Sequence, residues 1–539
     1  MRLRLSARIA AVLAAITAVS LAACSTAAPS ASTASTADTT IPLLTVGLNN
    51  TEDEAPQTLD VTKAIGADYI TVLGLETLMR FTAQGKVEPD LATSVTQPNP
   101  VTYVYHLRHG VKFWDGDPLT ATDVAFSMNY DRANGSQVAF AYPSVKSITA
   151  SGRYTVTVTL TQPDASWQYT PAEINSQIFE KKFYEAHKST YGQAGTLVMG
   201  TGPWKIDSFD PTTGAELSAN PHWWGGKVPI QRIKMTSFAS ATSEALAFRA
   251  GEIDLAPDVY TPLSFASTSG AKLLATPSCD IDIFIMHVTT APWNDVHVRR
   301  AVAYALDRSA IMTAHGGYAT PLYTLIPPSL MRNIASQSQI NSLLSSLPLY
   351  SYNVAKAKQE LAQSAYPHGF SAPILEVNDP TSLNEDQVIV AELQKIGIHL
   401  QIKAVTAADW NAVESGPASK RMSAETSASC FNPDPSAYYD LLGSANTAVG
   451  SWNVADYAPS AVDTLMSDGL ATNSPVQRFS TYSKLLDNLQ TNIPDVGLYL
   501  SDATVALSTK FIAPDYSYWT SPFSSTGQPD FYLDLKPAK

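Results

Sequence analysis

The feature that most constrains the fold is a helical pattern that passes directly into a strand pattern near Gly397. Segment 384–396 has the apolar spacing of an amphipathic helix, and Gly397 provides a residue suited to ending it. In segment 398–402 apolar and polar residues then alternate, as they do in a half-buried strand. A helix joined to a strand through one glycine is typical of layered α/β domains, so the sequence predicts an α/β fold.

Other segments support the same mixture of helices and strands. Strands are predicted at 43–48 and 154–160 from their apolar and alternating residues. Thr120 followed by Asp123 predicts a variant capping box that opens a helix. Asn353 is predicted to open another helix, ending near 366–369. Asn294 is predicted to cap a helix whose apolar face comprises Val298, Ala301, Val302, Ala305 and Leu306.

The N-terminus has the pattern of an export signal. Arg2, Arg4 and Arg8 precede a short apolar run, 9–23, which ends in small residues before Cys24. Leu-Ala-Ala-Cys at this point resembles a bacterial lipobox, which predicts cleavage after residue 23 and diacylation of Cys24. The alternative is an ordinary secretory signal with a chance cysteine. Ser, Thr, Ala and Pro dominate 24–40, which predicts a flexible tether.

Charge limits the choice of partner. The 539-residue chain carries a net charge of −13, and loss of the three arginines in 1–23 takes it to −16. An acidic chain without a Lys/Arg run is not suited to binding nucleic acid, so no nucleic-acid partner is expected. After residue 23, no apolar run reaches the roughly 20 residues that a membrane helix needs.

Few residues suggest catalysis or metal binding. No sequence signature of a nucleophile elbow, a phosphate-binding loop or a zinc protease is present. His106 and His109 lack a nearby acid or thiol, and Asp115-Gly116-Asp117 reads as a turn. The pair Asp280/Asp282 is spaced along one strand or turn, which does not place two acids across a sugar. We expect no enzyme, no cofactor and no metal.

Two cysteines remain after Cys24. Cys279 and Cys430 would occupy an oxidising compartment, where pairs of cysteines tend to form disulfides. Two buried thiols are the alternative, and the spacing alone does not decide between them.

Several ordered motifs resemble the family 5 extracellular solute-binding proteins, the oligopeptide, dipeptide and nickel receptors of ATP-binding-cassette importers. The longest is 107–124, Leu-Arg-His-Gly-Val-Lys-Phe-Trp-Asp-Gly-Asp-Pro-Leu-Thr-Ala-Thr-Asp-Val, which looks like the family signature. Further matches follow in the family's order: Gly200-Thr201-Gly202-Pro203-Trp204, Asn220-Pro221-His222-Trp223-Trp224, Arg249-Ala250-Gly251-Glu252-Ile253-Asp254, and 294–302 followed by Ala305-Leu306-Asp307-Arg308. Each match is weak alone, and the ordered set is specific.

The resemblance implies an α/β, two-lobed periplasmic-binding-protein-like fold of type II, in the large family 5 form with an inserted subdomain. Lobe one is expected at 41–278, with the inserted subdomain at about 79–195 and a return of the chain at 503–539. Lobe two is expected at 279–502. The implied function is capture of a peptide or similar small solute between the lobes and delivery to ABC permease subunits. The protein would act as a monomer tethered to the outer face of the bacterial cell membrane by its lipid.

The resemblance also suggests ligand contacts. Trp410 resembles a family tryptophan that often faces the ligand, although a tryptophan in the core of lobe two is the alternative. Segment 427–435 resembles the ligand-facing loop of peptide-binding members, and here Phe431 stands where those members have the acid that receives a peptide's ammonium group. The remaining expected contacts are Ser429 and Cys430 in the same loop and Asn49, Asn50 and Glu52 after the first strand.

In some peptide-binding members a cysteine at the position of Cys430 pairs with one at a position like that of Cys279, so the resemblance implies this disulfide. Two other functions remain open. A lipoprotein with this fold could serve sensing or cell-envelope regulation without transport, and a secreted hydrolase is the more distant alternative.

Overall fold

The computed structural model describes residues 40–49, 56–63, 68–257, 262–266, 268–513, 516–517, 519 and 529–538. The predicted signal, Cys24 and most of the predicted tether lie outside these residues. Within the described part of the chain, no helix combines the length and apolar character needed to cross a membrane.

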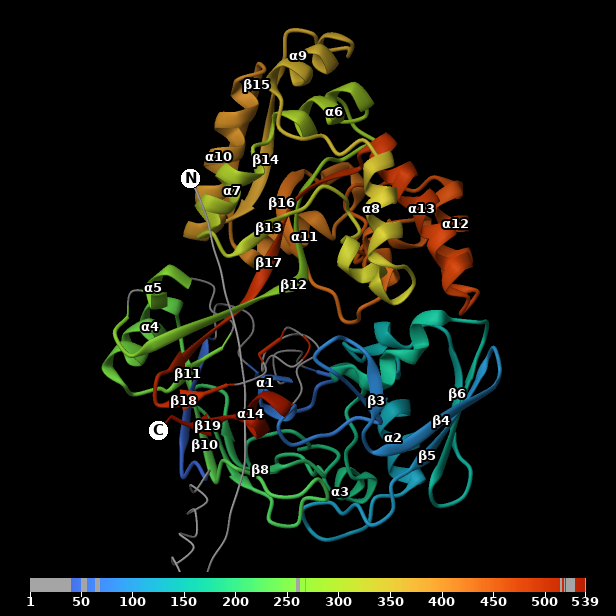
Figure 1. The fold of residues 1–539 in the computed structure, drawn as a ribbon, viewed down its shortest axis with the longest axis vertical. Helices are drawn as coiled ribbons and strands as arrows, with labels where there is room; N and C mark the ends of the chain where they lie inside the picture. Colours follow the sequence, from blue (N-terminus) through green and yellow to red (C-terminus); the bar gives the residue numbers. More distant parts are fainter. Residues whose placement is uncertain are drawn as a thin grey trace, which may run out of the picture. The chain divides into compact units, whose positions relative to one another are not determined.

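One mixed sheet runs through both lobes, and its two longest strands lie at its centre (Figure 1). The strand order is β15-β14-β16-β12-β17-β11-β1-β10-β9-β8, and β13 pairs with β17 as well. The central strands β12 (Ala271–Ile285) and β17 (Asp495–Ser508) pair antiparallel from Ala271 opposite Ser508 to Ile285 opposite Asp495. Their register is irregular between Pro277 and Ile281.

Lobe one lies on the β11 side of this central pair. It includes β1 (Leu44–Asn49), α1 (Asp68–Thr71), β8 (Trp204–Asp210), β9 (Gly214–Ala219), β10 (Arg232–Phe238), α4 (Ala241–Ala250), β11 (Leu255–Ala256), α5 (Pro262–Ala266), β18 (Phe511–Ile512), α14 (Asp530–Asp534) and β19 (Lys536–Pro537). Strand β1 is parallel to both β10 and β11. Phe531 and Tyr532 of the C-terminal helix α14, and Leu535 directly after it, are buried in the same core as β1, so the end of the chain packs with its first strand.

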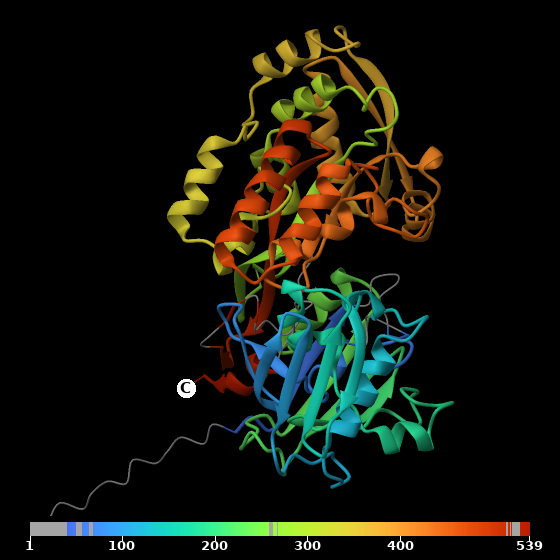
Figure 2. The same cartoon turned by 90° about the vertical axis from the view of Figure 1, so that its right-hand side faces the viewer.

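A subdomain with its own sheet is inserted between β1 and β8 (Figure 2). Its elements are β2 (Met79–Phe81), β3 (Val87–Pro89), β4 (Ala92–Asn99), β5 (Thr102–Leu107), α2 (Ala121–Asp131), β6 (Val145–Ala150), β7 (Thr155–Leu160) and α3 (Lys181–Ala186). The four-stranded sheet has the order β4-β5-β7-β6. Alternate residues of β7 are buried, and Val156, Val158 and Leu160 join a core of the subdomain's own.

Lobe two lies on the β16 side of the central pair. It includes α6 (Val296–Ala305), α7 (Arg308–His315), β13 (Ala319–Pro321), α8 (Gln337–Ser346), α9 (Val354–Ala362), β14 (Phe370–Val377), α10 (Pro380–Gln394), β15 (Ile398–Val405), α11 (Ala407–Glu414), β16 (Ser423–Ala428), α12 (Ser460–Leu470) and α13 (Pro475–Asn492). At β12 this sheet is buried on both faces. Ile281, Ile283 and Ile285 of β12 join one core and Phe284 joins the other, because successive side chains of a strand point to opposite faces.

Most local sequence predictions are confirmed. The predicted strands 43–48 and 154–160 correspond to β1 and β7, and α10, Gly397 and β15 form the predicted helix–strand unit. The Asp123 carboxylate accepts hydrogen bonds from the Thr120 backbone N–H (3.0 Å) and hydroxyl (2.7 Å), as a capping box requires. Asn353 caps α9 by accepting a hydrogen bond from the Lys356 N–H at 2.9 Å.

Two helix boundaries were wrong. Asp295, not Asn294, caps α6, because its Oδ1 accepts the His297 N–H at 2.9 Å while its Oδ2 accepts the Ala365 N–H at 2.9 Å. Helix α9 ends at Ala362, before the predicted end near 366–369, because the Ser364 hydroxyl donates to the Leu361 carbonyl at 2.7 Å and turns the chain.

Five carboxyl groups are buried where β12, β14 and β16 of lobe two meet α10: Asp282, Glu376, Glu385, Asp386 and Glu425. Glu385 accepts a hydrogen bond from the Tyr499 hydroxyl at 2.5 Å and lies 3.0 Å from His315 Nδ1. In the described part of the chain, Oε2 of Glu376 and both side-chain oxygens of Asp386 have no hydrogen-bond partner.

Burial is the main cause of the raised pKa values of three of these groups, Asp282, Glu376 and Asp386. It raises the pKa of Glu376 to about 9, with the charge of Asp386 adding to the effect, and raises the pKa of Asp282 and Asp386 to about 7. The folded chain therefore binds more protons here than the unfolded chain. The stability that results is complete below the unfolded pKa values near 4 and is lost as the pH rises through about 7 to 9.

We expect the melting temperature to fall between pH 5.5 and pH 8.5, as followed by circular dichroism at constant ionic strength. Glu376→Gln removes the charge while keeping the side-chain size, so it should flatten this dependence and raise the free energy of unfolding at pH 8.5 by on the order of 1 kcal/mol. Glu252→Gln, at an exposed position, is the control and should change neither the pH dependence of the melting temperature nor the free energy of unfolding. Stability that rises with pH, or equal effects of the two substitutions, would contradict this explanation.

Candidate functional site

The loop that follows β16 is attached to the central strand β12. A disulfide joins Cys430 of this loop to Cys279, with their Cα atoms 5.9 Å apart. The Cys430 N–H also donates to Asp280 Oδ1 at 3.3 Å, and the last residue of β16, Ala428, pairs with Ile281. The disulfide therefore fixes the loop against β12. Cys430 itself is fully buried, whereas the neighbouring Ser429 is exposed.

The same loop contacts the inserted subdomain. The half-buried ring of Phe431 lies 5.1 Å, centroid to centroid, from the ring of Phe140. The Asn432 side-chain amide donates to Glu173 Oε1 at 2.9 Å. Phe140 and Glu173 are site neighbours that the sequence analysis missed. Their separation from the loop is more than 250 residues, and no local pattern marks them.

Two carboxyl groups near Phe431, those of Glu173 and Asp434, have different surroundings. Burial raises the pKa of Glu173 to about 8, although the hydrogen bond from Asn432 opposes this effect. Asp434 forms a buried ion pair with Arg478, with 2.7 Å between Oδ1 and Nη2, and the same oxygen accepts the Ser436 N–H. This ion pair holds α13 against the loop.

Trp410 lies on α11 and is largely enclosed. Its side chain is 7% exposed and packs in one cluster with Leu375 of β14 and Ala424 of β16. In the described part of the chain, its indole N–H has no acceptor. This packing agrees with the alternative prediction, a tryptophan in the core of lobe two. The unpaired N–H leaves one polar atom for a further contact. Since Ala424 belongs to the strand that leads into the loop, Trp410 and the loop residues share one structural support.

The predicted contacts in lobe one are described only in part. Asn49 is the last residue of β1 and pairs in register with Phe238 of the parallel strand β10. Asn50 and Glu52 lie outside the described residues. In open α/β sheets the loops at the carboxyl ends of parallel strands form the ligand crevice, and residues 50–55 follow such an end.

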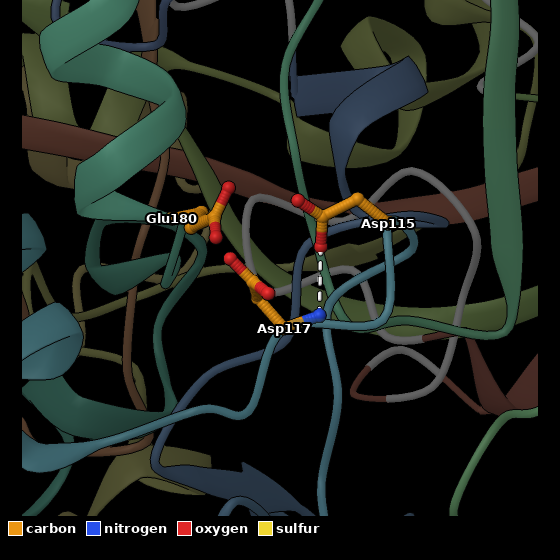
Figure 3. Close-up of side chains that lie close together, drawn as sticks. All are labelled: Asp115, Asp117 and Glu180. Carbon is orange, nitrogen blue, oxygen red and sulfur yellow. Dashed lines mark hydrogen bonds between the residues drawn. The ribbon is translucent and has the colours of Figure 1, made fainter.

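A group of three carboxylates lies elsewhere in the inserted subdomain, with Asp115 exposed, Asp117 half-buried and Glu180 buried (Figure 3). The turn predicted at Asp115-Gly116-Asp117 is confirmed, since the Asp117 N–H donates to Asp115 Oδ1 at 2.9 Å and Gly116 has a φ of +99°. Glu180 joins this pair, with one oxygen of each residue within 4.8 Å of the others. Burial and the two aspartates raise the pKa of Glu180 to about 7, and the Lys182 ammonium forms an ion pair with Asp117.

The sequence profile of the bacterial extracellular solute-binding proteins, family 5 Middle, matches residues 86–449. The glutathione-binding protein GsiB of Escherichia coli strain K12 is 26% identical over 450 residues, covering 80% of this chain and 85% of the relative. The heme-binding protein A of Haemophilus influenzae is 25% identical over 435 residues, covering 74% and 76% of the two chains.

Solved structures show the same fold. The periplasmic binding protein DppA of Helicobacter pylori, in complex with the peptide STSA, has a TM-score of 0.74 at 20% identity and covers 93% of this chain and 99% of its own. CtaP, an ABC transporter substrate-binding protein of Listeria monocytogenes, has a TM-score of 0.76 at 19% identity and covers 93% and 100%. With a profile match over more than half of its length, this chain belongs to the bacterial extracellular solute-binding proteins of family 5.

Proposed function

We propose that this protein captures a peptide or a similar small solute between its two lobes and delivers it to the permease of an ATP-binding-cassette importer. The observation that carries the proposal is the family match over residues 86–449. The names of the relatives, which include a glutathione-binding and a heme-binding protein, fit a receptor fold that accepts different small solutes. Capture needs affinity and closure of the lobes, and no covalent chemistry.

The proposed hinge lies in the central strands. The irregular register of β12 between Pro277 and Ile281 interrupts its pairing with β17 near Asp502. This interruption supports lobe boundaries at 278/279 and 502/503, because a strand is most easily bent where its ladder of hydrogen bonds is broken. The disulfide at Cys279 would then carry the loop 427–435 with lobe two when the lobes move.

The proposed solute contacts lie along the loop after β16 and at the end of β1. They are Trp410, Ser429, Cys430, Phe431, Asn49, Asn50 and Glu52. Support comes from the exposed Ser429, the half-buried Phe431 and the unpaired indole N–H of Trp410. These groups offer an aromatic wall and a few hydrogen bonds, which is the usual composition of a small-molecule site.

The loop favours a solute without a buried ammonium group. Phe431 supplies no charge, and Asp434 is already paired with Arg478. Glu173, with its pKa raised to about 8, is mostly protonated at neutral pH. An ammonium group held against Phe431 would lose its counter-ion at a cost of several kcal/mol. N-terminally blocked peptides and less polar solutes therefore fit the proposed site better than free-amine peptides do.

The proposal is tested by thermal shift with short peptides whose N-termini are free or acetylated. A bound solute should raise the melting temperature in proportion to ln(1 + [L]/Kd). Phe431→Asp restores an anion at this position, so it should shift the Kd ratio toward free-amine peptides by about tenfold at pH 7. Phe431→Asn is the matched control, because Asn has nearly the same shape as Asp but no charge, and it should not produce this shift.

Equal peptide preference in the two variants would remove Phe431 from the solute site. A melting temperature that no peptide or metabolite changes would instead favour a sensing or cell-envelope regulatory lipoprotein without transport.

We also infer that the mature protein starts at Cys24 and is held on the outer face of the cell membrane by lipid. The sequence Leu21-Ala22-Ala23-Cys24 and the Ser/Thr/Ala/Pro-rich segment behind it support this inference. Metabolic labelling with a fatty-acid analogue should therefore label the wild type, and Cys24→Ser should lose the label and appear in the medium. Ser25→Ala is the matched control and should stay labelled. Retention of label by Cys24→Ser would contradict the anchor.

A further inference from the structure

Lobe one contains a polar cavity of about 230 Å³. Its walls come from several distant parts of the chain. They include Glu76, Arg80 and Asp90 near the start of the inserted subdomain, Arg108, Gln177, the pair Trp223 and Trp224, and Asp530 of the C-terminal helix α14. Trp410 and the loop 427–435 do not line it. The cavity is somewhat smaller than a typical site for a drug-sized ligand, so its volume suits a compound of amino-acid size.

One carboxylate of the cavity, Glu76, is fully used within the protein. It accepts hydrogen bonds from the Thr201 hydroxyl (2.6 Å) and from the indole N–H groups of Trp223 (2.8 Å) and Trp224 (3.0 Å). Buried carboxylates are stable when they receive this many donors. Glu76 therefore fixes the two indoles as a wall and has little capacity for a ligand.

The cations of the cavity are also engaged. Arg80 forms ion pairs with Glu88 (2.7 Å) and Asp530 (2.9 Å). The Arg108 guanidinium stacks over the ring of Trp224, 4.1 Å from its centroid, and donates to the Asp90 backbone carbonyl. Among the described residues, Arg80 thus neutralises Asp530, and Arg108 donates to the backbone of Asp90 but not to its carboxylate.

Two lining groups have polar atoms without partners. In the described part of the chain, both the amide oxygen and the amide nitrogen of Gln177 lack a hydrogen bond, although this residue is 1% exposed. The Asp90 carboxyl group, 9% exposed, likewise receives no hydrogen bond from the described residues. Burying an amide without partners is unfavourable, so a ligand or solvent that pairs with it is favoured.

The charge of the cavity indicates which ligand fits. Glu76, Asp90 and Asp530 face two guanidinium groups, so the lining has one negative charge in excess when all three acids are ionised. Burial and the neighbouring acids Glu76 and Asp530 raise the pKa of Asp90. A cation in the cavity would lower this pKa again, because it would stabilise the carboxylate form. An anion would meet these acids at close range and is disfavoured.

We propose that this cavity is a second binding site, which takes a small organic cation with a primary ammonium or guanidinium group. Its N–H groups would donate to the Asp90 carboxylate and to the amide oxygen of Gln177, and the indole of Trp223 would cover its apolar part. The site belongs to lobe one alone and does not depend on the solute proposed between the lobes.

Isothermal titration of the full chain with methylguanidine and propylamine tests the proposal, with acetate and propanol as charge controls. The two cations should bind and the two controls should not. Asp90→Asn, which is nearly isosteric, should weaken cation binding about tenfold or more. Asp115→Asn, an exposed aspartate of the same subdomain, should leave it unchanged, as should Phe431→Asn in the proposed solute site.

A second variant separates binding from folding. Gln177→Leu removes the unpartnered amide, so it should raise the melting temperature of the free protein while weakening cation binding. The proposal is overturned if neither cation binds, if acetate binds as well as the cations do, or if Asp90→Asn binds the cations with wild-type affinity.

Discussion

The pairing of β12 with β17 is the interaction on which the rest of the structure depends. These two strands pair from Ala271 opposite Ser508 to Ile285 opposite Asp495, with an interruption between Pro277 and Ile281, and they carry the sheet from one lobe into the other. Strand β11 attaches to β17 on the side of lobe one, and β16 attaches to β12 on the side of lobe two. A single antiparallel ladder therefore supports both the end of β1 and the loop after β16, the two places where solute contacts are proposed.

Local interactions made much of the fold predictable. Thr120 and Asp123 are three residues apart, so their capping box is visible in the sequence. Gly397 is visible in the same way, because the helical spacing of apolar residues ends there and the alternation typical of a strand begins after it. Prediction was wrong at Asn294, where two suitable caps are adjacent. There the choice of Asp295 depends on a second hydrogen bond to Ala365, 70 residues away.

The site was less predictable because its partners are far apart in the chain. The resemblance to a family indicated Trp410 and the loop around Phe431, but not the ring of Phe140 or the carboxyl group of Glu173 that contact this loop. The three donors to Glu76 come from 125 to 148 residues later in the chain, and none has a local signature. The first contacts form only when the inserted subdomain meets the loop of lobe two, and the second only when distant segments of lobe one pack together.

Both lobes contain buried carboxyl groups. Glu376 and Asp386 in lobe two and Asp90 in lobe one are enclosed without full sets of hydrogen bonds from the described residues. At the loop, in contrast, Phe431 is uncharged and Asp434 is neutralised by Arg478. Because net charge describes the whole surface, the negative net charge of the chain does not imply a cationic solute between the lobes.

Native mass spectrometry of the protein after incubation with a small-molecule extract of its growth medium tests the central claim most directly. A receptor for solutes should acquire one non-covalent adduct per chain, which disappears on denaturation and whose mass identifies the solute. Binding of this adduct should be weakened by Trp410→Phe, which keeps the packing but removes the indole N–H. A mass that remains that of the polypeptide alone in every extract would contradict the account.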